Sequence, residues 1–187
     1  EESRHIVQAY VALDGDVSLR VRITNGEKAR LTVKVGQNSM TRDEFEYSIP
    51  LDDARKMADN CLGIAAEMTL KPITVAVLDA AGDLKVLLRQ DGTSTLRPDI
   101  AQGKARGAIA LGMGSRAIYE RAKEQPYFIQ SMNALSGGSL VPVPGGGLIR
   151  RDGAILGAVG ITGDTSDNDE ACASRAIEAA GFVADAG

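Results

Sequence analysis

The sequence predicts a mixed α/β fold of the α+β kind, in which helices flank a sheet and a small β-meander precedes the main domain. Apolar and polar residues alternate with a period of two in three stretches of the first fifty residues, which is typical of half-buried strands. Two further strands are predicted between Leu148 and Ile161, around Asp152-Gly153, the dipeptide that type I′ hairpin turns favour. After residue 50 apolar residues recur at helical spacing instead.

The N-terminal strands are predicted over 19–23, 31–35 and 44–49, where one set of alternating positions is apolar. Asn25-Gly26 is a hairpin signal between the first two strands, and residues 36–41 make a looser connection to the third. Three strands with one apolar face are only marginally stable alone. We therefore expect this face to extend the main sheet or to cover a neighbouring subunit.

The other face of this meander collects cations and carboxylates. Such a mixture could hold a polyphosphate and a divalent metal together. A solvated sheet face with cross-strand ion pairs would show the same pattern, so both interpretations stay open. The four cations are Arg20, Arg22, Lys34 and Arg42, and the two carboxylates are Glu44 and Glu46.

This N-terminal segment resembles the interior strands of the CYTH family in YVALDGDVSLRVRI, ARLTVKVG and TRDEFEYSIPLDDAR. CYTH proteins are triphosphate-tunnel enzymes such as thiamine triphosphatases and class IV adenylate cyclases. The resemblance implies that the four cations bind phosphate and that the two carboxylates bind metal. The family's opening Glu-x-Glu-x-Lys motif is absent, and the pattern ends at 50–58, before the later strands of an eight-stranded tunnel. Half a tunnel cannot enclose a triphosphate, so a phosphohydrolase would require dimerisation.

An amphipathic helix is predicted directly after Pro50, and Cys61 lies on its apolar stripe. Cys172 falls in a later predicted helix. Two cysteines so far apart form neither a disulfide framework nor a CxxC metal motif. Because free cysteine is usually buried, we expect both to be small core residues and neither to be a nucleophile. The other residues of the stripe are Ala54, Met57, Ala58, Ala65 and Met68.

A last helix is predicted after the hairpin. Ser166 or Asp167 is expected to cap it, and it should run to about Val183. Asp169 and Glu170 would then lie in its first turn, where the helix dipole favours negative charge.

The main domain closely resembles the GlcG/HbpS family of small haem-interacting domains. Three segments carry the resemblance: VAVLDAAGDLKVLLRQDG at 75–92, KARGAIALGMGSRAI at 104–118, and SGGSLVPVPGGGLIRRDGAILGAVGITGDTSDNDE at 136–170. It implies a profilin-like fold, an antiparallel sheet with helices on its faces, and a tendency to form homo-oligomers. Some members of that family bind haem or iron. We interpret the chain as a fusion of a CYTH-like strand fragment, 1–50, with a GlcG/HbpS-like domain, 51–187.

The resemblance implies that the main domain binds a small molecule: a tetrapyrrole, iron or a small carboxylate. Glycines let backbone N–H groups approach an anion, a helix N-terminus adds a favourable dipole, and cations could hold propionates or a small acid. Tight turns and helix caps use the same residue types, so a purely structural role stays open. The candidate ligand-binding residues are Arg89, Lys104, Arg106, Gly145, Gly146, Gly147, Asp167 and Glu170.

Haem iron is usually held by His, Cys, Met or Tyr. The only histidine is His5, so a bis-histidine site within one subunit is excluded. Haem would need an unusual ligand such as a hydroxyl, or a site shared between subunits. With His5 set aside, no Ser/His/Asp or Cys/His arrangement is available, and the P-loop pattern is absent, so the sequence does not support an enzyme.

Composition narrows the range of partners. Apolar residues make up 44% of the 187 residues, which is ample for a core. The net charge of −4 argues against nonspecific nucleic-acid binding, and no apolar stretch approaches the roughly 18 residues of a membrane span. The first residues also lack a signal-peptide layout. We expect a cytoplasmic, oligomeric, small-molecule-binding protein without nucleic-acid or membrane partners; an assembly module without a ligand is the remaining alternative.

Overall fold

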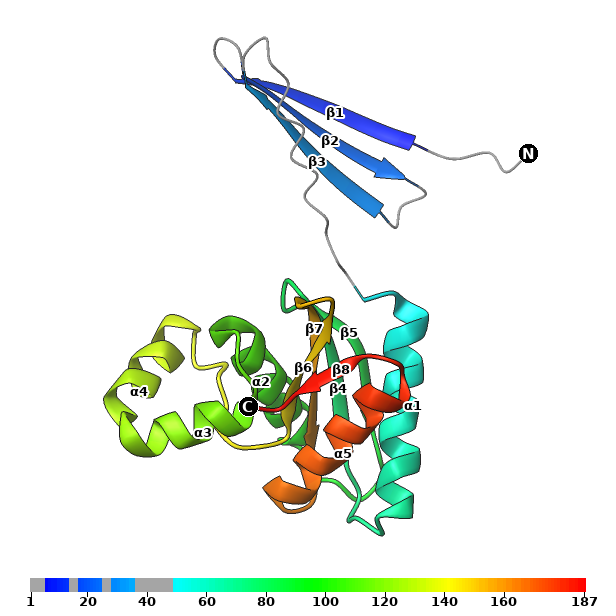
Figure 1. Cartoon of the computed structure of the whole chain (residues 1–187), viewed down its shortest axis with the longest axis vertical. Helices are drawn as coiled ribbons and strands as arrows, with labels where there is room; N and C mark the ends of the chain where they lie inside the picture. Colours follow the sequence, from blue (N-terminus) through cyan, green and yellow to red (C-terminus); the bar gives the residue numbers. More distant parts are fainter. Residues whose placement is uncertain (1–5, 14–16, 25–27, 36–48) are drawn as a thin grey trace, which may run out of the picture. The chain divides into compact units, whose positions relative to one another are not determined.

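The N-terminal strands form a three-stranded antiparallel sheet in the order β1-β2-β3 (Figure 1). The computed structural model describes residues 6–13, 17–24, 28–35 and 49–187, and the chain divides into two units, Glu1–Glu46 and Tyr47–Gly187. The strands are β1 (Ile6–Leu13), β2 (Val17–Thr24) and β3 (Lys28–Val35).

Strands β2 and β3 confirm the two strands predicted over 19–23 and 31–35, and Thr24 pairs with Lys28 across the hairpin. The predicted turn residues Asn25-Gly26 themselves lie outside the described residues, as do residues 44–48 of the third predicted strand. Strand β1 was not predicted, because its sequence IVQAYVAL is apolar at most positions and lacks a clear alternation.

The second unit is built on a five-stranded sheet in the order β5-β4-β7-β6-β8. Every neighbouring pair is antiparallel, which confirms the predicted kind of sheet. The strands are β4 (Thr74–Asp79), β5 (Leu84–Arg89), β6 (Gly146–Arg151), β7 (Ala154–Thr162) and β8 (Val183–Asp185).

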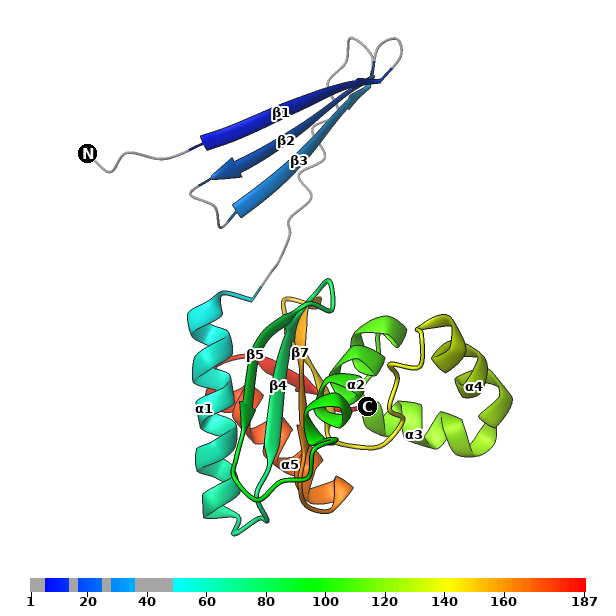
Figure 2. The ribbon, with the colours of Figure 1, turned by 180° about the vertical axis from the view of Figure 1, so that it is seen from behind.

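Helices cover both faces of this sheet, so the mixed α/β fold is confirmed. Helices α1 and α5 lie side by side on one face, α2 lies on the other, and α3 and α4 extend beyond α2 (Figures 1 and 2). None of the helices in the described part of the chain is long and apolar enough to cross a bilayer. The helices are α1 (Leu51–Glu67), α2 (Arg97–Leu111), α3 (Ser115–Glu124), α4 (Pro126–Leu135) and α5 (Ser166–Ala179).

The core has a layer on each side of the sheet. Val75 and Val77 of β4 belong to the larger cluster, which is shared with α1 and α5. Leu78 belongs to a smaller cluster on the α2 side. Cys61 and Cys172 are both fully buried in the larger cluster, which confirms their predicted role as small core residues.

Helix α2 rests on the sheet with its backbone in close contact. A Cβ atom at Gly160 of β7 would lie 1.9 Å from the carbonyl oxygen of Ala101, and one at Gly146 of β6 would lie 2.6 Å from that of Lys104. Only glycine fits at such an approach. The backbone of α2 therefore lies directly against β6 and β7 at these two positions.

The hairpin between β6 and β7 has the predicted turn, because Asp152 and Gly153 both have positive φ angles, 51° and 79°. The start and end of the last helix differ from the prediction. Thr165, and not Ser166 or Asp167, caps α5, and its hydroxyl accepts a bond from the Asn168 N–H at 3.3 Å.

Helix α5 also stops earlier than predicted, at Ala179 and not near Val183. Gly181 has a φ of 86°, a left-handed conformation that ends helices. Val183 then enters β8 and pairs with Arg150 of β6. Pairing with a distant strand therefore decides the structure of residues whose local sequence is compatible with a helix.

Candidate functional site

Lys104 and Asp169 form an ion pair inside the main domain. The Lys104 Nζ donates to Asp169 Oδ2 at 2.9 Å and to the Ile161 carbonyl at 2.8 Å, and the two side chains are 2% and 1% exposed. Burial lowers the pKa of Lys104, and the Asp169 charge partly opposes that change. The pair ties α2, β7 and α5 together, so Lys104 already has a carboxylate partner within the core.

The predicted glycine loop packs directly on this lysine. A Cβ at Gly145, whose φ is 118°, would lie 2.7 Å from Lys104 Nζ. The Gly146 N–H donates to the Ser115 hydroxyl at 2.6 Å, and a Cβ at Gly147 would lie 3.2 Å from Ile177 Cδ1. Close packing against backbone atoms thus accounts for Gly145 and Gly146, whereas a Cβ at Gly147 would meet only the end of a flexible side chain; the Gly146 N–H already has a hydrogen-bond partner.

Asp167 and Glu170 are joined to a residue that the sequence did not single out. Arg116 of α3 donates to both Glu170 carboxylate oxygens, at 3.0 and 3.1 Å, and also pairs with Asp167. These hydrogen bonds raise the pKa of Arg116. The sequence could not predict this contact, because nothing near Arg116 in the chain indicates that it pairs with Asp167 and Glu170, which are far away in the sequence.

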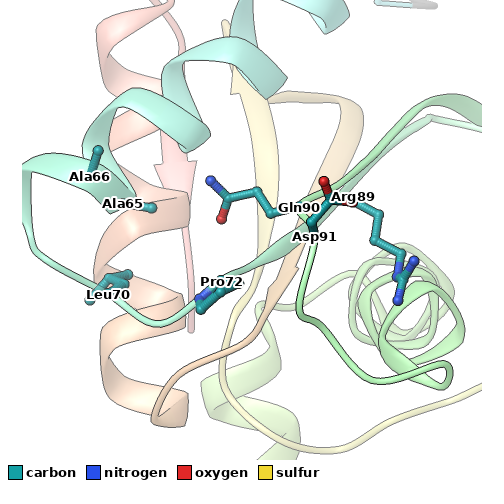
Figure 3. A pocket seen from close by; sticks show the side chains of 7 residues that line it. All are labelled: Ala65, Ala66, Leu70, Pro72, Arg89, Gln90 and Asp91. Atoms are coloured by element: carbon teal, nitrogen blue, oxygen red, sulfur yellow. The ribbon is translucent and has the colours of Figure 1, made fainter.

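Arg89 lines an open hollow of about 570 Å³ between the end of α1 and β5 (Figure 3). Its side chain extends away from Ala65 and donates from Nη2 to the Thr93 carbonyl at 2.5 Å. Gln90 points back over the hollow, where its Oε1 accepts a bond from the Ile73 N–H at 2.8 Å. The other lining residues are Ala66, Leu70, Pro72 and Asp91.

Arg106 lines a different hollow, of about 330 Å³, between α2 and residues 137–141. Its Nη2 donates to the Gln102 side chain at 3.3 Å, within the same helix. Arg89, Lys104 and Arg106 are therefore not brought together: the first and last line separate hollows, and Lys104 lies in the core.

Three further polar residues gather where α2 begins. Arg97 donates from Nη1 to the Thr162 hydroxyl at 2.6 Å, and Thr162 pairs across the sheet with Thr74. Thr74 is fully buried, and its hydroxyl has no hydrogen-bond partner within the described part of the chain. The sequence signal for this group is weak: a threonine directly before the apolar run Val75–Leu78 of β4, TVAVLD.

The residues of the predicted phosphate and metal site are only partly described. Arg20 and Arg22 lie on β2 and Lys34 lies on β3, whose backbones pair in register. In the described residues no three His, Cys, Asp or Glu side chains gather as a metal site. The remaining residues of interest, Arg42, Glu44, Glu46 and His5, lie outside the described ranges.

The two cysteines are poor nucleophiles and poor thiolate ligands. Burial raises the pKa of the Cys61 thiol, and it raises the pKa of Cys172 to about 12. Because the thiolate is the reactive form, both thiols should be inert at neutral pH.

Comparison with known proteins gives a family for the main domain. The family model described as "Haem degrading protein HbpS-like" matches residues 49–178. An uncharacterized 15.0 kDa protein of Citrobacter freundii is 29% identical over 142 residues, which covers 74% of this chain and 96% of that protein.

Solved structures share the fold. Klebsiella pneumoniae protein ORFY superposes with a TM-score of 0.69 and 23% identity, covering 77% of this chain and 98% of that one. PduOC, solved as a haem complex, gives a TM-score of 0.65 and 24% identity over 72% of this chain and 96% of that one. Streptomyces reticuli HbpS, solved as a double mutant, superposes with a TM-score of 0.61 and 24% identity. The match covers 78% of this chain and 92% of that one.

A separate, partial match concerns another class of protein. An inorganic triphosphatase of Acetivibrio thermocellus is 40% identical over 52 residues, which cover 28% of this chain. This chain spans only 33% of that protein's length.

Proposed function

Because this chain belongs to the HbpS-like family, we propose that it is a small-ligand-binding protein that interacts with haem or a related tetrapyrrole. The family match over residues 49–178 carries this proposal. The haem complex of PduOC, which shares the fold, supports it.

The lining of the two hollows bears on how such a ligand would be held. Arg106 lines one hollow, and Arg89 lies at the edge of the other with its guanidinium turned away from it; each is a cation suited to a propionate group. Neither lining includes a His, Cys, Met or Tyr, so these residues do not fit the role of axial ligand to iron. These residues could therefore bind a tetrapyrrole through its propionates, and they offer no ligand for chemistry at the iron.

Haemin titration tests this function, with the Soret absorbance as the readout. We expect a saturable, shifted band, and a weaker affinity in Arg89→Gln or Arg106→Gln according to which hollow is used. Arg55→Gln, an exposed arginine of α1, is the matched control. A spectrum that matches free haemin at every protein concentration would contradict the proposal.

We further propose that the protein is a homo-oligomer. Strand β5 is an edge of the sheet, and its Leu84 and Leu87 are 43% and 36% exposed. An exposed apolar edge strand is a ready surface for association between copies. Light scattering after size-exclusion chromatography would measure the mass, and a monomer at micromolar concentration would contradict this part.

We also propose that residues 1–50 and 51–187 are separate modules of a fusion. The family match begins at residue 49, and the division between units falls after Glu46. Expression of residues 47–187 alone would test this. A cooperative unfolding transition close to that of the full chain is expected, and aggregation would argue against separate modules.

A second candidate function concerns the N-terminal unit, and the partial match to an inorganic triphosphatase favours it. In this proposal the cations of β2 and β3 bind triphosphate with a divalent metal, in a tunnel completed by a second copy. Phosphate release from inorganic triphosphate should then require magnesium or manganese and should be lost in Arg22→Ala. Undetectable hydrolysis, together with no thermal shift by haemin, would favour the assembly module without a ligand.

A further inference from the structure

Three residues form a row across the sheet at one end of the main domain. Thr74 of β4 pairs with Arg89 of β5 on one side and with Thr162 of β7 on the other. Residues paired directly across antiparallel strands point to the same face of the sheet. Leu78, four residues along β4 from Thr74, packs in the cluster shared with α2, so the row lies on the face that α2 covers.

Helix α2 adds a second guanidinium above this row. Arg97, its first residue, donates to the Thr162 hydroxyl at 2.6 Å. Arg89 bends towards the segment that leads into α2 and donates to the Thr93 carbonyl. Figure 3 shows the same side chain directed away from the hollow beside α1. Arg89 is exposed and Arg97 is half-buried, so the row is open to solvent at its Arg89 end.

The row has more hydrogen-bond donors than acceptors. Thr74 is fully buried, and its hydroxyl is without a partner in the described residues. The Thr162 hydroxyl accepts from Arg97, and within the same residues its own proton has no acceptor. The ion pairs formed among the described residues include neither Arg89 nor Arg97.

This imbalance defines the chemistry of a suitable ligand. A buried hydroxyl without a partner is costly, and two guanidinium groups without a carboxylate leave positive charge uncompensated. A carboxylate supplies only acceptors and matches the planar fork of arginine. The start of α2, a helix of 15 residues, also favours a negative charge.

The surrounding charges favour an anion as well. The positive charge of Arg97 contributes to the lowered pKa of Lys104. Among the described residues, the only carboxylate that is hydrogen-bonded to Lys104 is that of Asp169. Within the described residues, Arg97 forms no ion pair with a carboxylate, and the acidic residue in its own helix turn is Asp99. An anion bound at the row would reduce this repulsion between like charges.

We propose that Arg89, Arg97 and Thr74 form a binding site for one carboxylate group, carried by a free small acid or by the propionate arm of a tetrapyrrole. Arg89 receives the ligand at the open end, Arg97 pairs with it from α2, and the Thr74 hydroxyl donates from the floor. The site follows from these residues alone and does not depend on haem binding.

Calorimetric titration of the full chain with acetate, lactate, succinate and inorganic phosphate, at constant ionic strength, tests the site. Saturable binding of at least one carboxylate is expected, with affinity reduced tenfold or more in Arg89→Gln and in Arg97→Gln. Arg55→Gln is the matched control, because Arg55 is an exposed arginine of α1, on the face of the sheet opposite to the row. Equal affinities in Arg97→Gln and Arg55→Gln would overturn the proposal.

Thr74→Val separates binding from stability. Valine has nearly the shape of threonine and removes a hydroxyl that has no partner among the residues the structure describes, so the free protein should fold and melt at an equal or higher temperature. Its affinity for the carboxylate should fall. Unchanged affinity in this variant would remove Thr74 from the site and overturn the three-residue arrangement.

Haemin and haemin dimethyl ester distinguish the two sources of the carboxylate. If small acids bind and haemin does not, the site stands and the proposed tetrapyrrole function fails. If haemin alone binds, and both esterification and Arg97→Gln weaken its binding, the site holds a propionate. The site is refuted if no small acid binds and haemin affinity is insensitive to Arg97→Gln, whatever the outcome for haem binding.

Discussion

The Lys104 ammonium lies 2.9 Å from the Asp169 carboxylate, in the interior of the domain, and 65 residues separate the two in the sequence. Lys104 comes from the middle of α2, and Asp169 comes from the first turn of α5. The helices lie on opposite faces of the sheet and meet through this pair at the end of β7, where the Ile161 carbonyl accepts a second bond from Lys104.

Removal of Lys104 should therefore be strongly destabilising. Lys104→Met leaves the Asp169 carboxylate buried without its cation, and the loss of one partner of a buried pair typically costs about 3–5 kcal/mol. Urea unfolding followed by circular dichroism would measure the change. Arg106→Gln, two residues away on the exposed side of α2, should change the free energy of unfolding by less than about 0.5 kcal/mol. A cost below about 1 kcal/mol for Lys104→Met would contradict the importance of the pair.

Asp164 should make the protein sensitive to acid. Its carboxylate accepts bonds from the Lys71 N–H, the Thr165 N–H and the Asn168 side chain, and these lower its pKa from 3.8 to about 2. Between those pH values the unfolded chain binds more protons than the folded one, so stability falls as the pH drops through this window.

The variant Asp164→Asn removes the titrating group and should flatten this part of the profile. Chemical unfolding at a series of pH values from 5 downwards would compare the two proteins, within the range where the native state persists. Parallel profiles for wild type and variant would show that Asp164 does not contribute.

Gly160 should not tolerate a side chain. A methyl group there would lie 1.9 Å from the Ala101 carbonyl oxygen, so Gly160→Ala must push α2 away from the sheet, at a cost of about 3 kcal/mol or more. Gly63→Ala is the control, because Gly63 lies within α1 with nothing within 4 Å of the added atom. That change should stabilise the protein by about 1 kcal/mol. Thermal unfolding should show a lower melting temperature for Gly160→Ala and a higher one for Gly63→Ala. Equal changes in melting temperature would disprove the close contact at Gly160.

Both thiols should be unreactive in the folded protein. Cys61 and Cys172 are fully buried, and burial raises the pKa of each. Titration with an aromatic disulfide reagent at pH 8 should label two thiols in denaturant and none on the same timescale without it. Rapid labelling of the native protein would mean that α1 and α5 separate readily.

Local patterns predicted those parts of the fold that depend on nearby residues. Asp152-Gly153 predicted its turn because both residues accept the left-handed conformation that the turn requires. The apolar stripe that includes Cys61 predicted α1 for a similarly local reason. Val183 was wrongly placed in a helix because its strand exists only through pairing with Arg150. The resemblance of residues 51–187 to a known family indicated the antiparallel sheet.

The candidate site was harder to predict, because its contacts join residues far apart in the chain. Lys104 and Asp169 each look like ordinary helix residues until the sheet brings them together. Arg97, Thr74 and Thr162 come from three elements, and none of them forms a motif with its sequence neighbours. Arg89 was singled out for its charge, but the sequence could not indicate that it lies beside Thr74.

The backbone contact at Gly160 should affect which substitutions are recovered when the protein is evolved for altered ligand affinity. At Gly160 no side chain separates α2 from β7, so a small shift of the helix there would bring two backbones into collision, and Arg97 and Lys104 depend on the same helix position. Random mutagenesis selected for altered ligand affinity should therefore recover substitutions at buried glycines that touch no ligand, as well as at the arginines that do.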